Sequence, residues 1–129
     1  MASPLEKVLL VEDNNDIRAI VKVALQKLGG LEVCACESGV QALDAMTDFA
    51  PQLVLLDVMM PDMDGPTVLR RMRERPETAG IAVIFLTAKT TPQEIQALRS
   101  LGALDVIPKP FDPISLHQHV KRIWKASKR

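Results

Sequence analysis

The amino-acid sequence predicts an α/β fold, a doubly wound (βα)5 sandwich built on a five-stranded parallel sheet. Short apolar runs typical of buried strands recur along the chain at residues 7–11, 32–36, 53–57, 82–86 and 103–107. The intervals between these runs carry apolar residues at helical spacing, so strands and helices alternate. This alternation, with right-handed crossovers, places helices on both faces of a parallel sheet. We expect the strand order 2-1-3-4-5, a common order for doubly wound sheets.

Capping signals and apolar spacing define the five expected helices. The first ends at Gly29-Gly30 and is expected to bury Ile17, Ile20, Val21, Ala24, Leu25 and Leu28. The second lies near residues 39–49, with Val40 facing inward, and the third lies near residues 65–75. The segment from Thr91 to Glu94 forms a capping box that opens the fourth helix. Asp112-Pro113 caps the fifth, which is expected to bury Ile114, Val120, Ile123 and Trp124.

Composition indicates a single globular domain spanning residues 1–129. Hydrophobic residues make up 47% of the chain and charged residues 25%, and no apolar stretch reaches the length of a membrane span. The formal net charge of zero gives no indication of binding to nucleic acid or to a membrane. Cys34 and Cys36 lie two apart on one predicted strand, a poor arrangement for a disulfide, so we expect reduced thiols and a cytoplasmic location.

Polar side chains follow four of the predicted strands at the point where each strand ends. Glu12-Asp13 follows the first strand, Asp57 closes the third, Thr87 follows the fourth and Lys109 follows the fifth. In the order 2-1-3-4-5 the winding of the sheet reverses between the first and third strands, and ligands bind in the crevice at that point. The sequence therefore predicts that Glu12, Asp13 and Asp57 surround one crevice. Their oxygen ligands favour Mg²⁺ or a similar hard cation.

These residue types are the parts required for phosphoryl transfer. A carboxylate can act as the nucleophile, while a cation and a lysine neutralise charge on the oxygens of the transferring group. A hydroxyl such as that of Thr87 can hydrogen-bond the same group. Single residues have structural alternatives, because Asp13 or Asn14 can cap the first helix and Asp64 can form a turn and cap before Gly65. Their convergence at one sheet edge favours a shared chemical role.

Four segments of the chain resemble the receiver domain of two-component response regulators. They are Leu10 to Asn14, Leu55 to Gly65, Leu86 to Ala88, and Lys109 to Phe111. All four occur in the same order and at the same strand ends as in that family, so the set is far more specific than any one segment. The resemblance extends over nearly the full chain, and the flavodoxin-like order 2-1-3-4-5 is that of the same fold family.

The resemblance implies a signalling switch that catalyses only its own phosphorylation and dephosphorylation. Asp57 would accept a phosphoryl group from a histidine kinase or a histidine phosphotransfer protein. Asp13 and Asp57 would bind Mg²⁺, with Glu12 acting through water and the backbone carbonyl of Met59 as a further ligand. The fourth helix, fifth strand and fifth helix would form the surface that binds a downstream target protein or output domain.

The resemblance also assigns roles to residues around the phosphoryl group. Thr87 and Lys109 would contact its oxygens, and the peptide bond between Lys109 and Pro110 would be cis. Met59 and Lys89 would flank the path of a water molecule that hydrolyses the phosphorylated Asp57. A thioether accepts hydrogen bonds very weakly and an ammonium accepts none, so these side chains predict a long-lived phosphoryl group.

Some alternatives stay open at the level of sequence. Val106 stands where receivers usually carry tyrosine or phenylalanine, so the route of the switch to the surface is undetermined. A receiver-like scaffold that binds proteins without phosphotransfer also fits, as does a receiver excised from a larger regulator or hybrid kinase. An aspartate-nucleophile hydrolase is disfavoured because Met59 stands where a second carboxylate is usual. A flavin carrier is disfavoured because the acidic run from Glu12 to Asp16 would repel a phosphate.

Overall fold

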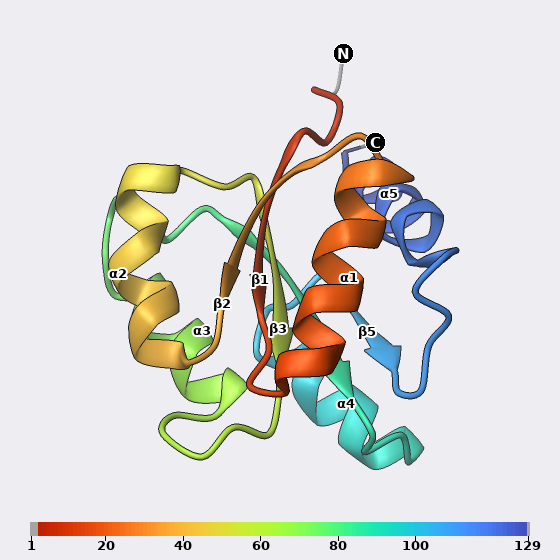
Figure 1. Ribbon diagram of the computed structural model, residues 1–129. Coiled ribbons are helices and arrows are strands. Elements are labelled where there is room, and N and C mark those ends of the chain that lie inside the picture. Colours follow the sequence, from red (N-terminus) through yellow and green to blue (C-terminus); the bar gives the residue numbers. More distant parts are fainter. Residues whose placement is uncertain (1–2, 129) are drawn as a thin grey trace.

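The computed structural model describes residues 3–128 and shows one parallel sheet with helices on both faces (Figure 1). Residues 1, 2 and 129 of the expected domain lie outside the described residues. The order β2-β1-β3-β4-β5 confirms the predicted order. The strands are β1 (Lys7–Val11), β2 (Glu32–Cys36), β3 (Leu53–Asp57), β4 (Ala82–Thr87) and β5 (Asp105–Pro108). The helices are α1 (Asn15–Lys27), α2 (Gly39–Phe49), α3 (Gly65–Arg73), α4 (Pro92–Ser100) and α5 (Leu116–Ser127).

Two apolar cores, one on each face of the sheet, hold the helices against the strands. Helices α1 and α5 cover one face, where Leu25 and Trp124 are buried (Figure 1). Helices α2, α3 and α4 cover the other, where Met46, Leu69 and Leu98 are buried. All residues of the central strand β3 are buried, because both of its faces pack against a core. The strands therefore form a middle layer between the two cores.

Local capping defines the helices that border the carboxyl edge of the sheet. The Asn14 side chain accepts a hydrogen bond from the Ile17 amide (2.9 Å) at the start of α1. The Asp64 side chain does the same for the Thr67 amide (2.9 Å) at the start of α3. Of the capping roles that the sequence left open, Asn14 and not Asp13 caps α1, and Asp64 caps α3. The capping box from Thr91 at the start of α4 is also present. Each cap satisfies a helix amide that would otherwise have no partner.

The predicted boundaries were wrong around β5 and α5. β5 begins at Asp105 instead of residue 103, because Gly102 has a positive φ of 103° and the turn after α4 continues past it. The Asp112 carboxylate accepts a hydrogen bond from the Ile114 amide (3.0 Å), so it caps a short turn and not α5. Helix α5 begins only at Leu116. Apolar composition alone does not distinguish an apolar turn from the end of a strand or helix.

Four residues that we expected to be buried are exposed instead. The exposed side chains are Ile20 (55%), Leu28 (51%), Val40 (52%) and Ile114 (67%). In α1 the buried residues are Val21, Ala24 and Leu25, which form a narrow stripe at i, i+3 and i+4 spacing. This buried stripe is narrower than the apolar face predicted for α1, so α1 exposes part of its apolar face to solvent.

The cysteines lie on the same face of β2, as predicted, and both are free thiols. Cys36 is buried under α2, whereas Cys34 is half-buried. Within residues 3–128, no helix combines the length and the apolar character needed to cross a membrane.

Gly65, the first residue of α3, lies close to the end of β3. A Cβ atom at Gly65 would lie 2.6 Å from the Asp57 carbonyl oxygen and 3.1 Å from the Phe85 ring. We therefore expect Gly65→Ala to reduce the free energy of unfolding by about 1–3 kcal/mol, the usual cost of overpacking a rigid site. Urea denaturation measures this change. Gly80→Ala is the control, because a Cβ there meets nothing within 4 Å. Equal stability of the two variants would contradict the packing argument.

Candidate functional site

The polar residues predicted from the strand ends meet at the carboxyl edge of the sheet. Glu12 directly follows β1, Asp57 is the last residue of β3 and Thr87 is the last residue of β4. Lys109 follows β5, and its backbone amide donates a hydrogen bond to the Thr87 carbonyl (2.7 Å). Asp57 pairs in register with Leu86, the residue before Thr87. Parallel pairing therefore brings all of these positions to one edge.

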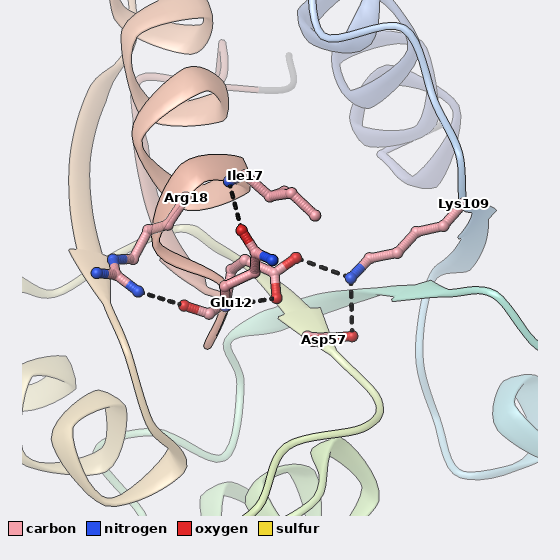
Figure 2. Close-up of polar contacts among 6 residues, drawn as sticks. Glu12, Ile17, Arg18, Asp57 and Lys109 are labelled. Atoms are coloured by element: carbon pink, nitrogen blue, oxygen red, sulfur yellow. Dashed lines mark hydrogen bonds and ion pairs between the residues drawn. The ribbon is translucent and has the colours of Figure 1, made fainter.

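Lys109 connects the two buried carboxylates of the site. Its Nζ lies 2.7 Å from Glu12 Oε1 and 3.2 Å from Asp57 Oδ1 (Figure 2). Glu12 is 1% exposed and Asp57 is 5% exposed, so neither carboxylate is well hydrated. A buried carboxylate needs a cationic or hydrogen-bonding partner, and Lys109 supplies it to both.

The acidic residues form a cluster with room for a cation. Glu12, Asp13 and Asp57 each offer a carboxylate oxygen, and these oxygens all lie within 4.8 Å of one another. Asp13 is exposed, so the cluster opens to solvent on that side. A set of carboxylate oxygens alone suits a hard divalent cation such as Mg²⁺ better than a soft metal. The residues present thus fit the predicted metal.

The electrostatics of the cluster oppose full ionisation. Burial raises the pKa of Asp57 to about 7, and the neighbouring Glu12 adds to this rise. Burial also opposes ionisation of Glu12, yet its contacts with Asp57 and Lys109 bring the pKa of Glu12 below the ordinary value. Burial lowers the pKa of Lys109, but its contacts with Glu12 and Asp57 outweigh burial and raise it. Without a bound cation, Asp57 is therefore the carboxylate that retains a proton most readily.

Sequence reasoning missed one residue that positions the site. Arg18 of α1 donates a hydrogen bond from Nη1 to the Glu12 carbonyl (2.9 Å) (Figure 2). It donates another from Nη2 to Asn15 Oδ1 (2.6 Å). This contact holds the backbone between β1 and α1 next to the acidic cluster. An arginine on a predicted helix surface has no distinguishing sequence signal, because its partner is a backbone carbonyl.

Two surface hollows adjoin the site. One, with a volume of about 510 Å³, lies between the loops after β3 and β4, and its lining residues are Val58, Met59, Met60, Pro61, Asp64 and Lys89. We call it the methionine groove. The other, of about 360 Å³, is apolar, and its lining residues include Ile17, Ile20, Pro110 and Phe111 next to Lys109. The peptide bond between Lys109 and Pro110 is cis, as the resemblance implied.

Thr87 is buried, and its Oγ1 accepts a hydrogen bond from the Lys89 amide (2.9 Å). This contact holds the side chain of Thr87 toward the loop after β4.

Met59 lies in the loop after β3, and its side chain is 60% exposed. The role of its backbone carbonyl as a metal ligand stays a prediction.

Removal of the Asp57 charge is expected to stabilise the metal-free protein. Because the pKa of Asp57 is raised to about 7 in the folded state, ionising it costs stability as the pH rises from the ordinary carboxyl range through 7. In EDTA at pH 8, Asp57→Asn should therefore raise the free energy of unfolding by about 1–3 kcal/mol. Urea denaturation at pH 8 and at pH 5 measures this, and the gain should be smaller at pH 5. Asp44→Asn, at an exposed carboxylate of α2, is the control. A destabilised Asp57→Asn variant at pH 8 would contradict the electrostatic argument.

Comparisons with known proteins agree with this geometry. The family model described as response regulator receiver domain matches residues 8–121. Sporulation initiation phosphotransferase F of Bacillus subtilis is 39% identical over 117 residues, which cover 91% of this chain and 92% of that protein. The probable chemotaxis protein CheY of Rhizobium etli is 34% identical over 122 residues, which cover 95% of each chain.

Other relatives carry the same region as part of a longer protein. The chain spans 30% of a protein-glutamate methylesterase/protein-glutamine glutaminase of Rhodospirillum rubrum, at 37% identity. Among solved structures, the chemotaxis response regulator CheY4 of Vibrio cholerae superposes with a TM-score of 0.84 at 30% identity, covering 92% of this chain and 98% of that one. The sequence motifs, the strand order and the family match all agree, and the chain belongs to the response regulator receiver domain family.

Proposed function

We propose that this receiver domain is a phosphorylatable signalling switch whose phosphoacceptor is Asp57. The observation that carries the proposal is the position of Asp57 at the end of β3, with its Oδ1 3.2 Å from the Lys109 ammonium and its carboxylate within the acidic cluster. A nucleophilic oxygen, a cationic partner and a site for a divalent cation thus lie together. The donor is a phosphohistidine of a histidine kinase or a histidine phosphotransfer protein.

In the proposed transfer, a carboxylate oxygen of Asp57 attacks the phosphorus atom of the donor. The bond from phosphorus to the imidazole nitrogen breaks, and its electron pair returns to the imidazole. Lys109 pairs with an oxygen of the transferred group, and the Thr87 hydroxyl donates a hydrogen bond to another. A Mg²⁺ ion held by Asp13, Asp57, Glu12 through water and the Met59 carbonyl would neutralise charge on the phosphoryl oxygens.

The apolar groove beside Lys109 supports a protein as the phosphodonor. Its wall includes Ile20, whose side chain is 55% exposed on α1, and Phe111 of the loop after β5. Exposed apolar surface next to a reactive group is typical of a protein contact. A donor helix seated there would present its phosphohistidine to Asp57.

The proposed output surface is formed by α4, β5 and α5. Thr87 would turn toward the phosphoryl group and break its contact with the Lys89 amide, at the start of the loop that leads to α4. Val106 of β5 is 7% exposed and belongs to the core under α4, so it already fills its site without a ring. The conformational change there should be small. The surface would bind a target protein or output domain in the cytoplasm, without direct contact to nucleic acid.

A scaffold that binds proteins without phosphotransfer is the second candidate function. It requires no metal site, so the acidic cluster with its raised Asp57 pKa would be an unexplained cost to stability. A receiver that forms part of a larger regulator is compatible with the first proposal.

Labelling with a small phosphodonor tests the proposal directly. With acetyl phosphate and Mg²⁺, we expect one phosphoryl group per chain, seen as a shifted band on a phosphate-affinity gel. Asp57→Asn should lose this label entirely, because the amide is not a nucleophile for phosphorus. Asp62→Asn, an exposed carboxylate in the same loop, is the matched control and should still label. Full labelling of Asp57→Asn would assign the phosphoacceptor elsewhere, and an unlabelled natural protein would favour the scaffold.

Magnesium should stabilise the protein and be required for labelling. The carboxylates of Glu12, Asp13 and Asp57 repel one another, and a bound cation would relieve this repulsion. Because the cation site exists only in the folded state, Mg²⁺ should raise the free energy of unfolding by mass action. Thermal melts in millimolar Mg²⁺ should show a higher Tm than melts in EDTA, and Asp57→Asn should reduce this shift. If Tm does not change and labelling proceeds in EDTA, the cation site is wrong.

Two residues that line the methionine groove should set the lifetime of the phosphoryl group. Met59 and Lys89 offer no good acceptor for the attacking water, so hydrolysis should be slow. Combining Met59→Asn with Lys89→Glu supplies two acceptors and should shorten the lifetime. The measurement is the decay of radiolabelled protein after removal of the donor, with each single variant as control. A lifetime in the double variant equal to or longer than that of the natural protein would refute this role.

A further inference from the structure

Met59 differs from the other described methionines in its exposure. Its side chain is 60% exposed, and Met63 is half-buried. Met46, Met60 and Met72 are 1%, 9% and 0% exposed. Oxidation of methionine follows access of the oxidant to sulfur, so Met59 is the described methionine most open to peroxide.

The position of Met59 links its oxidation state to the site. It follows Asp57 by two residues and lines the methionine groove together with Lys89. The backbone amide of Lys89 is bound to Thr87, so the opposite wall of the groove is anchored at the site as well. A chemical change at the Met59 sulfur therefore occurs in a groove whose two walls begin beside Asp57 and Thr87.

We propose that Met59 is a redox modification site, at which a peroxide converts the thioether to the sulfoxide and thereby shortens the lifetime of the phosphoryl group on Asp57. The inference rests on the proposed function of Asp57. In the modification, sulfur loses two electrons and gains one oxygen atom from hydrogen peroxide, which is reduced to water. The thioether is a very weak hydrogen-bond acceptor, whereas the sulfoxide is polar and its oxygen is a strong one.

The sulfoxide oxygen would speed hydrolysis of the phosphorylated Asp57 in two ways. It accepts a hydrogen bond from the attacking water and directs the lone pair of that water at phosphorus. A Lys89 ammonium in the same groove would otherwise pair with a phosphoryl oxygen and stabilise the phosphorylated state. The sulfoxide oxygen also accepts a hydrogen bond from this ammonium and so withdraws it from the phosphoryl group. In the hydrolysis itself, a bond forms between the water oxygen and phosphorus, and the bond from phosphorus to Asp57 breaks. The electron pair returns to the carboxylate, and a water proton leaves to solvent.

The cysteines are the competing targets of peroxide. Burial raises the pKa of Cys36 to about 12, so its reactive thiolate is scarce. Cys34 is half-buried, and both side chains face the core under α2 and not the methionine groove. A variant that lacks only the Met59 sulfur retains both thiols and therefore separates the two effects.

The experiment compares the natural protein with Met59→Leu, which keeps the backbone carbonyl and the apolar bulk. Each is treated with hydrogen peroxide, mapped by peptide mass spectrometry, phosphorylated with acetyl phosphate and followed by decay of the label. We expect the sulfoxide to form at Met59 before Met46 and Met72, and the lifetime to fall about 2–10-fold, the rate equivalent of one hydrogen bond. Peroxide should not change the lifetime of Met59→Leu. Untreated Met59→Gln, which carries an amide oxygen in place of the sulfoxide, should show a shortened lifetime.

The outcomes distinguish this inference from the proposed function. If the untreated protein cannot be labelled, both are overturned. If labelling is normal but oxidised Met59 leaves the lifetime unchanged, only the inference is overturned. The same holds if Met59 oxidises no faster than Met46, or if peroxide shortens the lifetime of Met59→Leu equally, which would assign the effect to another side chain.

Discussion

The burial of two carboxylates around one ammonium is the constraint on which the site depends. Glu12 and Asp57 are almost fully buried, and Lys109 contacts both. If both carboxylates were ionised, the three groups would carry a net negative charge in a poorly hydrated place, which explains the raised pKa of Asp57. The folded protein therefore holds an incompletely neutralised site. In the proposed function, a cation or a transferred phosphoryl group would change that balance, so the same electrostatics would link stability to signalling.

The sheet keeps this costly cluster in place through backbone contacts that do not depend on its charge. The Val58 amide donates to the Leu86 carbonyl (3.1 Å), so β3 and β4 stay paired one residue beyond Asp57. Gly65 allows α3 to approach the Asp57 carbonyl, and Arg18 holds the Glu12 carbonyl from the opposite side. The backbone of the acidic residues is thus fixed before any ligand arrives. Such preorganisation reduces the free energy needed to assemble the site during transfer.

The residues proposed to set how long a signal lasts lie outside the buried cluster. Met59 and Lys89 are exposed and line a groove instead of a core, so their substitution or modification has little effect on packing. In the proposed function, phosphoryl acceptance and the lifetime of the phosphorylated product are therefore governed by different side chains. Acceptance would depend on the buried ion-pair network of Glu12, Asp57 and Lys109, and the lifetime would depend on exposed groups of the methionine groove.

The sequence by itself determined the fold class, the strand order and the edge at which Glu12, Asp57, Thr87 and Lys109 meet. The reason is that buried parallel strands have continuous apolar runs, and their carboxyl ends share one edge. The caps at Asn14 and Asp64 were also predictable, because a cap bonds an amide only a few residues away.

Only the tertiary structure decided features that depend on contacts distant in sequence. The exposure of Ile20 and Ile114 depends on whether another helix or loop packs against these side chains. The contact of Arg18 with a carbonyl, and the common groove of Met59 and Lys89, depend on how loops from separate strands are placed. The raised pKa of Asp57 arises from burial and from the approach of Glu12, and neither can be read from the residue order. Local patterns specify elements and their ends, whereas three-dimensional packing sets exposure, pairing and ionisation.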